Sequence, residues 1–332
     1  MGEKTGIAWC SHTFNPWMGC TKVSPGCANC YAEKSPAVTF KGIGWGPGAP
    51  RVRTVESNWR QPLKWNRAAE RDGVRRRVFC ASLADWLDDA VPAQWLADLL
   101  GLIYATPHLD WLLLSKRPET WRQRLLAAAE CFASTAIPGP IVARQWLAGQ
   151  APANVWIGTT VEDDERKRRA FELSRIPARI RFLSMEPLLA LPGQLDLRGI
   201  DWVIVGGESG PRARPFNVAW ARTIIEWCRA IGAVPFVKQM GAVPLARDYL
   251  PPMNSDDALE TLGMAPVSRA DVRSDGPMRE WPDGTHFGNR TGKLELNGRV
   301  ALMKDGHGAD PLEWPEDLRV QEFPAAQENP NA

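Results

Sequence analysis

The sequence is poor in the residues and segments that mark several common protein classes. Its four histidines, His12, His108, His286 and His307, are scattered, which excludes the short ligand spacings of metal-dependent hydrolases. No run approaches the roughly 18 consecutive apolar residues of a membrane-spanning helix. The amino terminus has no basic segment followed by an apolar stretch, so we expect no signal peptide. We therefore expect a cytoplasmic protein.

The chain also lacks a strong overall charge. A net charge of +2 does not by itself indicate a nucleic-acid partner, so phosphate binding would need a local basic patch. Three basic clusters are present, at Arg51–Arg53, Arg75–Arg77 and Arg166–Arg169. Such clusters are more often solvated faces of helices or loops than binding sites. If they do bind phosphates, affinity should fall steeply with salt.

Three of the seven cysteines, Cys20, Cys27 and Cys30, lie within eleven residues. In a cytoplasmic protein, cysteines at such spacing are better interpreted as ligands than as disulfides. Cys27 and Cys30 can place both sulfurs on one metal or cluster, and the turn at 24–26 would bring Cys20 to the same point. Three protein ligands leave one coordination position open. Structural zinc is the alternative, with Cys10 or His12 as the fourth ligand.

Short apolar runs recur along the chain and predict strands buried on both faces. The predicted strands are Arg77–Ser82, Asp110–Ser115, Asn154–Thr160, Ile180–Ser184, Asp201–Gly206 and Val234–Lys238, with a further first strand around Thr13–Met18. Pro92–Ile103 and Val218–Ile231 have apolar residues at helical intervals. Six or seven successive βα units predict an α/β protein with a complete or partial (β/α) TIM-like barrel over residues 1–240. A doubly wound open sheet is the alternative.

Residues 241–332 differ from the rest of the chain. This region is rich in proline, glycine and aspartate and poor in long periodic segments. We expect a loop-rich extension packed on the barrel, with the last residues disordered.

Polar residues follow the predicted strands at their carboxyl ends, where α/β enzymes place their active sites. These residues are Ser82 and Asp85, Ser115 to Arg117, Thr159 to Asp163, Ser184 to Glu186, Gly206 to Gly210, and Lys238 with Gln239. Any one set could simply end a strand and cap the next helix. Their repetition after five or six strands predicts a functional site at this edge.

Several motifs together resemble one family. They are Thr5–Trp9, Phe14–Trp17, Gly19–Glu33, Ser115–Pro118, Met185–Pro187, Gly206–Gly210 and Asp310–Arg319. The chain resembles, over nearly its whole length, the phage-associated three-cysteine-motif proteins, a domain of unknown function. That family is in turn similar to radical S-adenosylmethionine (SAM) enzymes, including the spore photoproduct lyase type. The usual spacing there is three residues and then two, whereas this chain has six and then two.

The resemblance implies a barrel of the radical SAM type. Cys20, Cys27 and Cys30 would hold a [4Fe–4S] cluster whose fourth iron binds SAM, and Tyr31 would shield the cluster or pack against the adenine. The cofactor would then yield a 5′-deoxyadenosyl radical. A reductase or flavodoxin-type electron donor and a three-Cys-motif partner protein are the implied partners.

The strand ends supply candidate SAM contacts. Ser82 or Asp85 could bind the ammonium group, and Ser115, Lys116 and Arg117 could meet the SAM carboxylate or a substrate phosphate. The remaining candidates are Glu162 or Glu186 for the ribose hydroxyls, and the run Gly206, Gly207 and Glu208 for close approach to the adenine or substrate.

Two functions follow as hypotheses. The first is a radical SAM enzyme of phage or mobile-element context that modifies or repairs a nucleic-acid base. The second is a zinc-stabilised binding module that recognises a partner protein or DNA without chemistry. Iron and a brown colour would favour the first, and one equivalent of zinc the second.

Overall fold

The computed structural model describes residues 5–132, 138–245 and 309–324, together with His307 and four short strands between residues 279 and 302. The chain divides into two compact units. The first contains Met1–Thr160 and Arg168–Leu183, and the second contains Val161–Lys167 and Ser184–Ala332. Strand β7 (Ile180–Met185) spans the division between them.

Four parallel strands form the centre of the first unit. They are β1 (His12–Phe14), β4 (Arg76–Cys80), β5 (Leu109–Ser115) and β6 (Val155–Thr160). β4 pairs with β1 on one side and β5 on the other, and β5 pairs with β6. Every residue of β6 is buried, as the apolar run predicts. The sequential order without reversal agrees with a TIM-like α/β arrangement more than with a doubly wound sheet.

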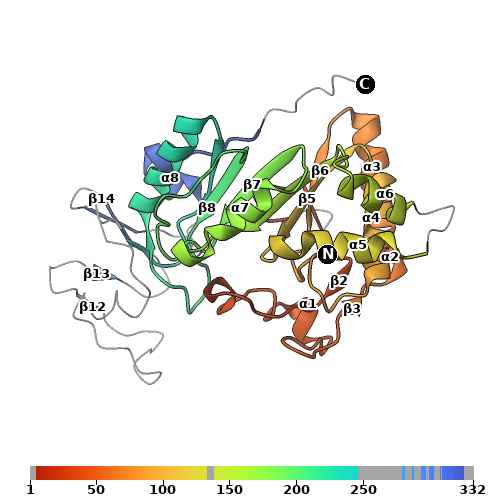
Figure 1. Ribbon diagram of the computed structural model, residues 1–332. Helices are drawn as coiled ribbons and strands as arrows, with labels where there is room; N and C mark the ends of the chain where they lie inside the picture. The colour runs from red at the N-terminus through yellow and green to blue at the C-terminus, as the bar shows by residue number, and fades with distance from the viewer. Residues whose placement is uncertain are drawn as a thin grey trace. The chain divides into compact units, whose positions relative to one another are not determined.

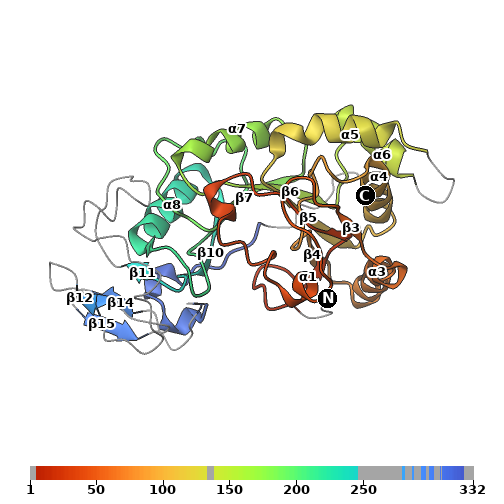
Figure 2. The same cartoon turned by 90° about the horizontal axis from the view of Figure 1, so that it is seen from below.

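Helices pack beside these strands. The longer ones are α3 (Gln61–Asp72), α4 (Ala93–Tyr104), α5 (Trp121–Ala129) and α6 (Gly139–Leu147), and the shorter ones are α1 (Pro36–Thr39), α2 (Glu56–Trp59) and α7 (Arg168–Ser174). α4 buries Leu96, Leu99, Leu100 and Ile103, the helical spacing expected from the sequence. Helices α4, α5 and α6 lie together in both views of Figures 1 and 2.

A small antiparallel pair, β2 (Trp17–Met18) with β3 (Val52–Arg53), frames the cysteine loop. The predicted strand around Thr13–Met18 is therefore two short strands, because residues 15 and 16 leave the parallel sheet. The chain between β2 and β3 contains the 3-10 turn η1 (Pro25–Cys27) and helix α1.

The second unit is built on two parallel strands and one long helix. β8 (Trp202–Gly206) pairs with β10 (Val234–Gln239), and α8 (Val218–Ile231) connects them. The Asn217 side chain accepts a hydrogen bond from the Ala219 amide at the start of α8, and Gly232, with φ +77°, ends it. β9 (Phe216–Asn217) pairs with β11 (Pro244–Leu245).

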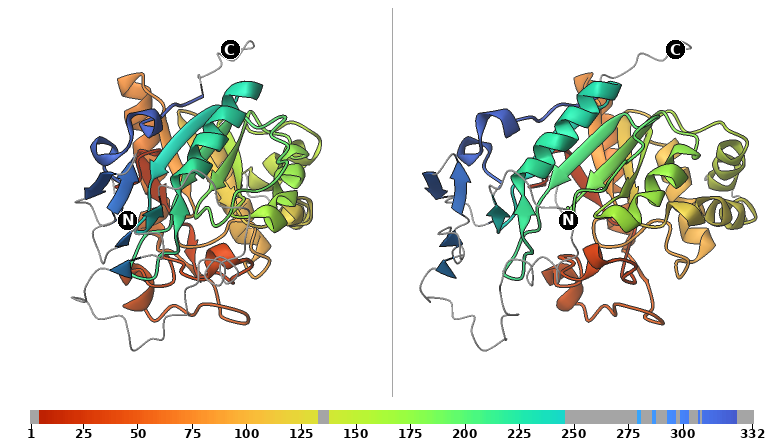
Figure 3. Two further views of the ribbon diagram at one scale, coloured as in Figure 1. Left: turned by 90° about the vertical axis from the view of Figure 1, so that its left-hand side faces the viewer. Right: turned by 60° about the vertical axis from the view of Figure 1, so that its left-hand side comes forward.

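The carboxyl-terminal part packs within the second unit. The 3-10 turns η4 (Pro311–Glu313) and η5 (Glu316–Leu318) bury Trp314 and Leu318, and Gln321 bridges to Phe236 on β10. Figure 3 shows this blue segment beside α8. Part of the predicted extension therefore packs on β10 and α8.

Two antiparallel pairs lie in the same extension. They are β12 (Arg279–Glu280) with β13 (His286–Phe287), and β14 (Lys293–Leu296) with β15 (Arg299–Leu302). Residues 246–278 and the last eight residues lie outside the described part, so the expected boundary near 240 and the expected disorder stay predictions. Within the described ranges no helix combines the length and the apolar character needed to cross a membrane.

Candidate functional site

Residues from three parallel strand ends meet in the first unit, as the sequence predicts. After β1, Asn15 donates to Ser82 Oγ at 2.9 Å and accepts from the Leu83 amide at 2.7 Å. After β5, the Lys116 amide donates to Asp85 Oδ2 at 3.0 Å. Hydrogen bonds thus join residues that follow β1, β4 and β5 at one edge of the sheet.

The cysteine loop lies against this edge. The Gly19 amide donates to the Leu83 carbonyl at 3.1 Å, which fixes the start of the loop beside the residues that follow β4. Gly19 has φ +103°, a conformation that favours glycine. Cys20, Cys27 and Cys30 are free thiols of intermediate burial. The loop therefore presents three thiols where the strand ends gather.

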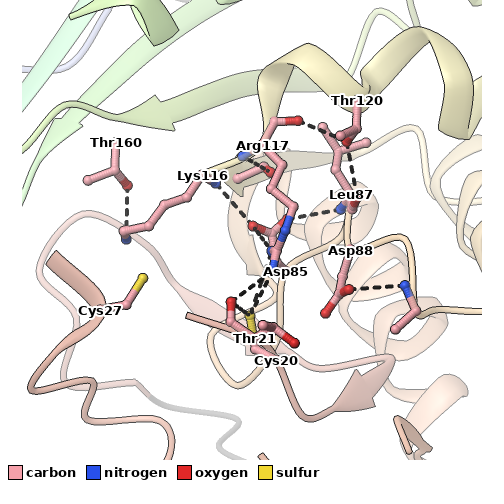
Figure 4. Close-up of polar contacts among 12 residues, drawn as sticks. Cys20, Thr21, Cys27, Asp85, Leu87, Asp88, Lys116, Arg117, Thr120 and Thr160 are labelled. Carbon is pink, nitrogen blue, oxygen red and sulfur yellow. Dashed lines mark hydrogen bonds and ion pairs between the residues drawn. The ribbon is translucent and has the colours of Figure 1, made fainter. Parts of the chain in front are cut away.

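A buried ion pair connects the strand ends to the first thiol. Arg117 Nη1 lies 2.9 Å from Asp85 Oδ2, and both side chains are less than a tenth exposed. The same guanidinium donates to Cys20 Sγ at 3.7 and 3.9 Å and to the Thr21 carbonyl at 2.8 Å (Figure 4). Asp85 also accepts from the Leu87 amide, so both of its oxygens are engaged.

A second buried pair holds the next residue of the loop. Arg51 Nη2 lies 2.8 Å from Asp88 Oδ2, and each side chain is 1% exposed. Arg51 also donates to Thr21 Oγ1 at 2.7 Å and to the Ala49 carbonyl at 2.8 Å. Two arginines therefore converge on the dipeptide Cys20–Thr21.

Lys116 differs from its neighbour Arg117. Its Nζ donates to Thr160 Oγ1 at 3.2 Å, and no carboxylate of the described residues lies within ion-pair distance of it. In Figure 4 the Cys27 sulfur points toward the end of the Lys116 side chain. Among the described residues, Lys116 is therefore a cation at the carboxyl edge without a carboxylate partner, suited to a carboxylate or phosphate.

The Cys20 thiol is held in its neutral form. Burial, followed by the nearby Asp85 charge, raises the pKa of Cys20 from 9.0 to about 12, while Arg117 acts in the opposite direction. A metal ion that bound Cys20 would have to displace this proton.

The three thiols fit a soft metal or an iron–sulfur cluster in kind, since all are free and lie on one loop. They are not gathered around a common point. Nowhere in the described ranges do three or more His, Cys, Asp or Glu side chains form a group able to hold a metal ion. Metal binding would therefore require the thiols to turn toward one another.

His12 and Cys10, the candidate fourth ligands of the zinc alternative, have contacts away from the three cysteines. His12 is buried and stacks on Trp65, with ring centroids 4.3 Å apart. Cys10 is buried, and its Sγ lies 3.9 Å from the Ile7 carbonyl oxygen. The structure therefore does not bring either residue into a metal-binding group with the cysteine trio.

Two further predicted residues have defined contacts. The Tyr31 hydroxyl donates to the Ser82 carbonyl at 3.1 Å, while the side chain stays largely exposed. Ser115 is buried, and its hydroxyl accepts from the Arg117 amide at 2.9 Å. Ser115 therefore shapes the turn that follows β5, and its role as a SAM contact stays a prediction.

The other predicted residues belong to the second unit. Glu186 Oε2 pairs with Lys238 Nζ at 3.2 Å, and its Oε1 is buried with no hydrogen-bond partner among the residues that the structure describes. A Cβ on Gly206 would lie 2.7 Å from that Oε1, and one on Gly207 would lie 2.5 Å from the Met240 carbonyl oxygen. The approach of backbone atoms therefore requires glycine at position 207, whereas a side chain at position 206 would have to displace the Glu186 carboxylate.

Glu208 and Glu162 also lie in the second unit. Glu208 pairs with Arg214 through both carboxylate oxygens, at 2.7 and 2.9 Å. Glu162 is fully buried, and its carbonyl accepts from the amides of Leu189 and Ala190. The cofactor contacts predicted for these residues remain predictions.

The basic clusters are largely engaged in ion pairs. The pairs are Arg51 with Asp88, Arg53 with Asp98, Arg75 with Asp110, Arg76 with Asp72, Arg166 with Asp163, Lys167 with Asp164, and Arg168 with Glu172. Arg169 donates to the Thr160 carbonyl. These clusters therefore offer little free positive charge to phosphates.

Sequence reasoning missed the most buried part of the site. It placed Arg51 in a surface cluster and did not consider Asp88 or Thr21, yet these three residues form one hydrogen-bonded group. No periodic pattern marks them. The only available signal was an arginine beside a cysteine loop with acidic residues at the end of β4.

A family model described as "Protein of unknown function (DUF5131)" matches residues 4–298. No curated protein and no solved structure matches the chain.

Proposed function

The chain belongs to the DUF5131 family of proteins of unknown function, and we propose, from its cysteine loop and its resemblance to radical SAM enzymes, that it is a radical SAM enzyme. Cys20, Cys27 and Cys30 would hold a [4Fe–4S] cluster. When bound, such a cluster supplies the electron that cleaves SAM and starts radical chemistry.

One observation carries this proposal. A loop of three free thiols lies at the carboxyl edge of sequential parallel strands, beside an unneutralised lysine and a buried arginine. The thiols are the ligands that iron–sulfur clusters prefer, and the lysine can bind an anionic group. Parallel α/β sheets bind ligands at this edge.

Different residues at the carboxyl edge would bind different groups of SAM. Lys116 would bind the carboxylate, because its charge is not neutralised by the described residues. Asp85 has both oxygens engaged, so the half-buried Ser82 hydroxyl is the better partner for the ammonium group. Tyr31 would cover the thiols from the solvent side, since its hydroxyl reaches the Ser82 carbonyl.

A nucleic-acid base as the substrate rests on the family resemblance alone, because the basic clusters are engaged in ion pairs. Salt dependence tests this part separately. Binding of a short duplex that weakens steeply with salt would support phosphate contacts, and a flat dependence would remove nucleic acid as the substrate.

The test of the core proposal is anaerobic reconstitution with iron and sulfide, followed by reduction in the presence of SAM. We expect a brown protein that contains iron and forms 5′-deoxyadenosine. Cys20→Ala, Cys27→Ala and Cys30→Ala should each abolish both properties. Cys131→Ala is the matched control, because Cys131 is also a half-buried free thiol and lies outside the loop.

Two outcomes would overturn the proposal. One equivalent of zinc with no iron would favour the zinc-stabilised binding module. Iron uptake that persists in the three loop variants, or is lost equally in Cys131→Ala, would move the metal away from this loop.

A further inference from the structure

Arg117 directs two N–H donors at the sulfur of Cys20 (Figure 4). Its Nη1 and Nη2 lie 3.7 and 3.9 Å from Cys20 Sγ, while the thiol itself lies 3.5 Å from the Thr21 carbonyl oxygen. A thiol is a weak hydrogen-bond acceptor, whereas an ionised acceptor such as a thiolate makes much stronger bonds. The contact therefore suits Cys20 as a metal-bound thiolate better than as a free thiol.

The guanidinium of Arg117 is held in place without help from the sulfur. Its Nη1 lies 2.9 Å from Asp85 Oδ2, and its Nη2 donates to the Thr21 carbonyl at 2.8 Å. The Arg117 amide donates to Ser115 Oγ at 2.9 Å, which fixes the backbone from which the side chain extends. Three bonds thus keep the positive charge beside Cys20.

Asp85 is fixed as firmly as Arg117. Its Oδ1 accepts from the Leu87 amide and its Oδ2 from the Lys116 amide, each at 3.0 Å. The Asp85 and Arg117 side chains are both less than a tenth exposed. Burying such a pair is costly, and apolar residues of similar volume would often stabilise a fold as well. A buried pair directed at a sulfur therefore favours an electrostatic role there.

Arg51 provides a built-in comparison, because it contacts the same dipeptide in another way. It is also a buried arginine paired with an aspartate, Asp88, at 2.8 Å. It donates to Thr21 Oγ1 at 2.7 Å, and its contacts with the described residues do not include Cys20 Sγ. Arg51 and Arg117 thus share burial, charge and the loop that they hold, and they differ in the bond to sulfur.

We propose that Arg117 is a positioning residue that acts through Cys20 to set the reduction potential of the metal centre, with Asp85 acting in the opposite sense. Hydrogen bonds and positive charge at a thiolate ligand withdraw electron density and favour the reduced metal, whereas a nearby carboxylate favours the oxidised one. The iron–sulfur cluster as the occupant rests on the proposed function. The bond of Arg117 to a metal-bound Cys20 holds for any thiophilic metal.

A potentiometric titration of the reconstituted protein, followed by cluster absorbance, tests this role. Arg117→Met should shift the midpoint potential to more negative values, and Asp85→Asn, which keeps the shape of the side chain, should shift it to more positive values. Arg117→Lys keeps the charge and should lie between Arg117→Met and the natural protein. Arg51→Met is the matched control and should leave the potential unchanged.

Cadmium tests the bond to sulfur without iron. Donors at a thiolate lower the energy of its lone pairs, so their loss should move the sulfur-to-cadmium charge-transfer band to longer wavelength. We expect this shift in Arg117→Met, the opposite shift in Asp85→Asn, and the band of the natural protein in Arg51→Met.

The opposite signs separate this role from a general loss of stability, which would change Arg117→Met and Asp85→Asn alike. Shifts of the same sign in these two variants, or an equal shift in Arg51→Met, would overturn the proposal. A protein that binds iron and shows no shift in Arg117→Met would overturn it and leave the proposed function standing. Cadmium bands that shift as expected, in a protein that takes up no iron, would support the role of Arg117 and overturn the proposed function.

Discussion

At the scale of single residues, the adjacent cations Lys116 and Arg117 have different surroundings. Arg117 is buried and engaged with Asp85, Cys20 and Thr21, so little of its donor capacity remains for a ligand. Lys116 has only a hydroxyl as its side-chain partner among the described residues. Arg117 is therefore engaged within the protein, whereas we propose that its neighbour Lys116 binds a ligand.

The first prediction concerns Lys116. Lys116→Met should raise the dissociation constant for SAM roughly 10- to 100-fold, because a charge-assisted hydrogen bond contributes roughly 1.5–3 kcal/mol. Isothermal titration calorimetry of the reconstituted protein measures this. Lys64→Met, at an exposed lysine on α3, is the control and should bind SAM normally. Equal affinities of the two variants would remove Lys116 from the SAM site.

The second prediction concerns Cys228 on α8. Burial raises the pKa of this thiol from 9.0 to about 12, so the folded protein keeps a proton that the unfolded chain releases above pH 9. Stability from this group is therefore complete below about pH 9 and declines as the pH rises toward 12, by at most about 1.4 kcal/mol per unit.

Urea unfolding at about pH 8 and about pH 10 measures this contribution. The natural protein should lose more stability between the two pH values than Cys228→Ala, which lacks the thiol. Identical losses in the two proteins would show that the Cys228 pKa is not raised by folding.

At the scale of elements, the sequence predicts what local patterns determine. Continuous apolar runs located β4 to β8 and β10 to within two residues, and helical periodicity located α4 and α8. The first strand was placed less well, because it was predicted around Thr13–Met18 whereas β1 ends at Phe14. The meeting of Ser82, Asp85 and Lys116 also followed from the sequence, because parallel strands end at one edge.

The sequence did not predict which residues distant from each other in the chain form ion pairs and hydrogen bonds. Arg51 and Asp88 are 37 residues apart, and Arg117 and Cys20 are 97 apart. A charged residue in a loop has no periodic signature that distinguishes a buried pair from a solvated one. The contacts of Arg51 and Arg117 with the cysteine loop could therefore be identified only from the fold, which places the loop beside the residues that follow β4.

The third prediction concerns the contact between α4 and α6. A Cβ on Gly139 would lie 1.8 Å from the Ala97 carbonyl oxygen, so the two helices can approach this closely only with glycine there. Gly139→Ala should destabilise the protein by about 2 kcal/mol or more, because backbone atoms would have to move. Thermal unfolding measures the loss.

Gly193→Ala provides the control for this substitution. A Cβ there would meet only Asp164 Oδ1, at an ordinary contact distance of 3.6 Å. We expect a change within about 0.5 kcal/mol. A Gly139→Ala protein as stable as Gly193→Ala would show that the helices can separate at little cost.

At the scale of the whole molecule, residues 309–324 complete the second unit. Phe323 packs on Trp202 and Phe236, with ring centroids 5.6 and 5.2 Å away, and Asp317 pairs with Arg222 on α8. The Val237 amide donates to the Val320 carbonyl at 2.7 Å. This segment is part of the core of the unit.

The fourth prediction follows from these contacts. A chain truncated after residue 308 should lose at least about 3 kcal/mol of stability, since it loses the aromatic packing of Phe323 and the burial of Trp314 and Leu318. A chain truncated after Pro324 keeps every contact described above and serves as the control. Comparable urea midpoints for the two chains would show that the segment is dispensable.

The pairing of β10 with residues 320–322 also has a consequence during protein synthesis. Gln321 and Val237 are 84 positions apart, so β10 leaves the ribosome long before the segment that covers its outer side. During that interval the nascent chain carries an open strand edge, which is a template for pairing with other chains. Pauses in translation between these two points would prolong the exposure and increase the demand for chaperones.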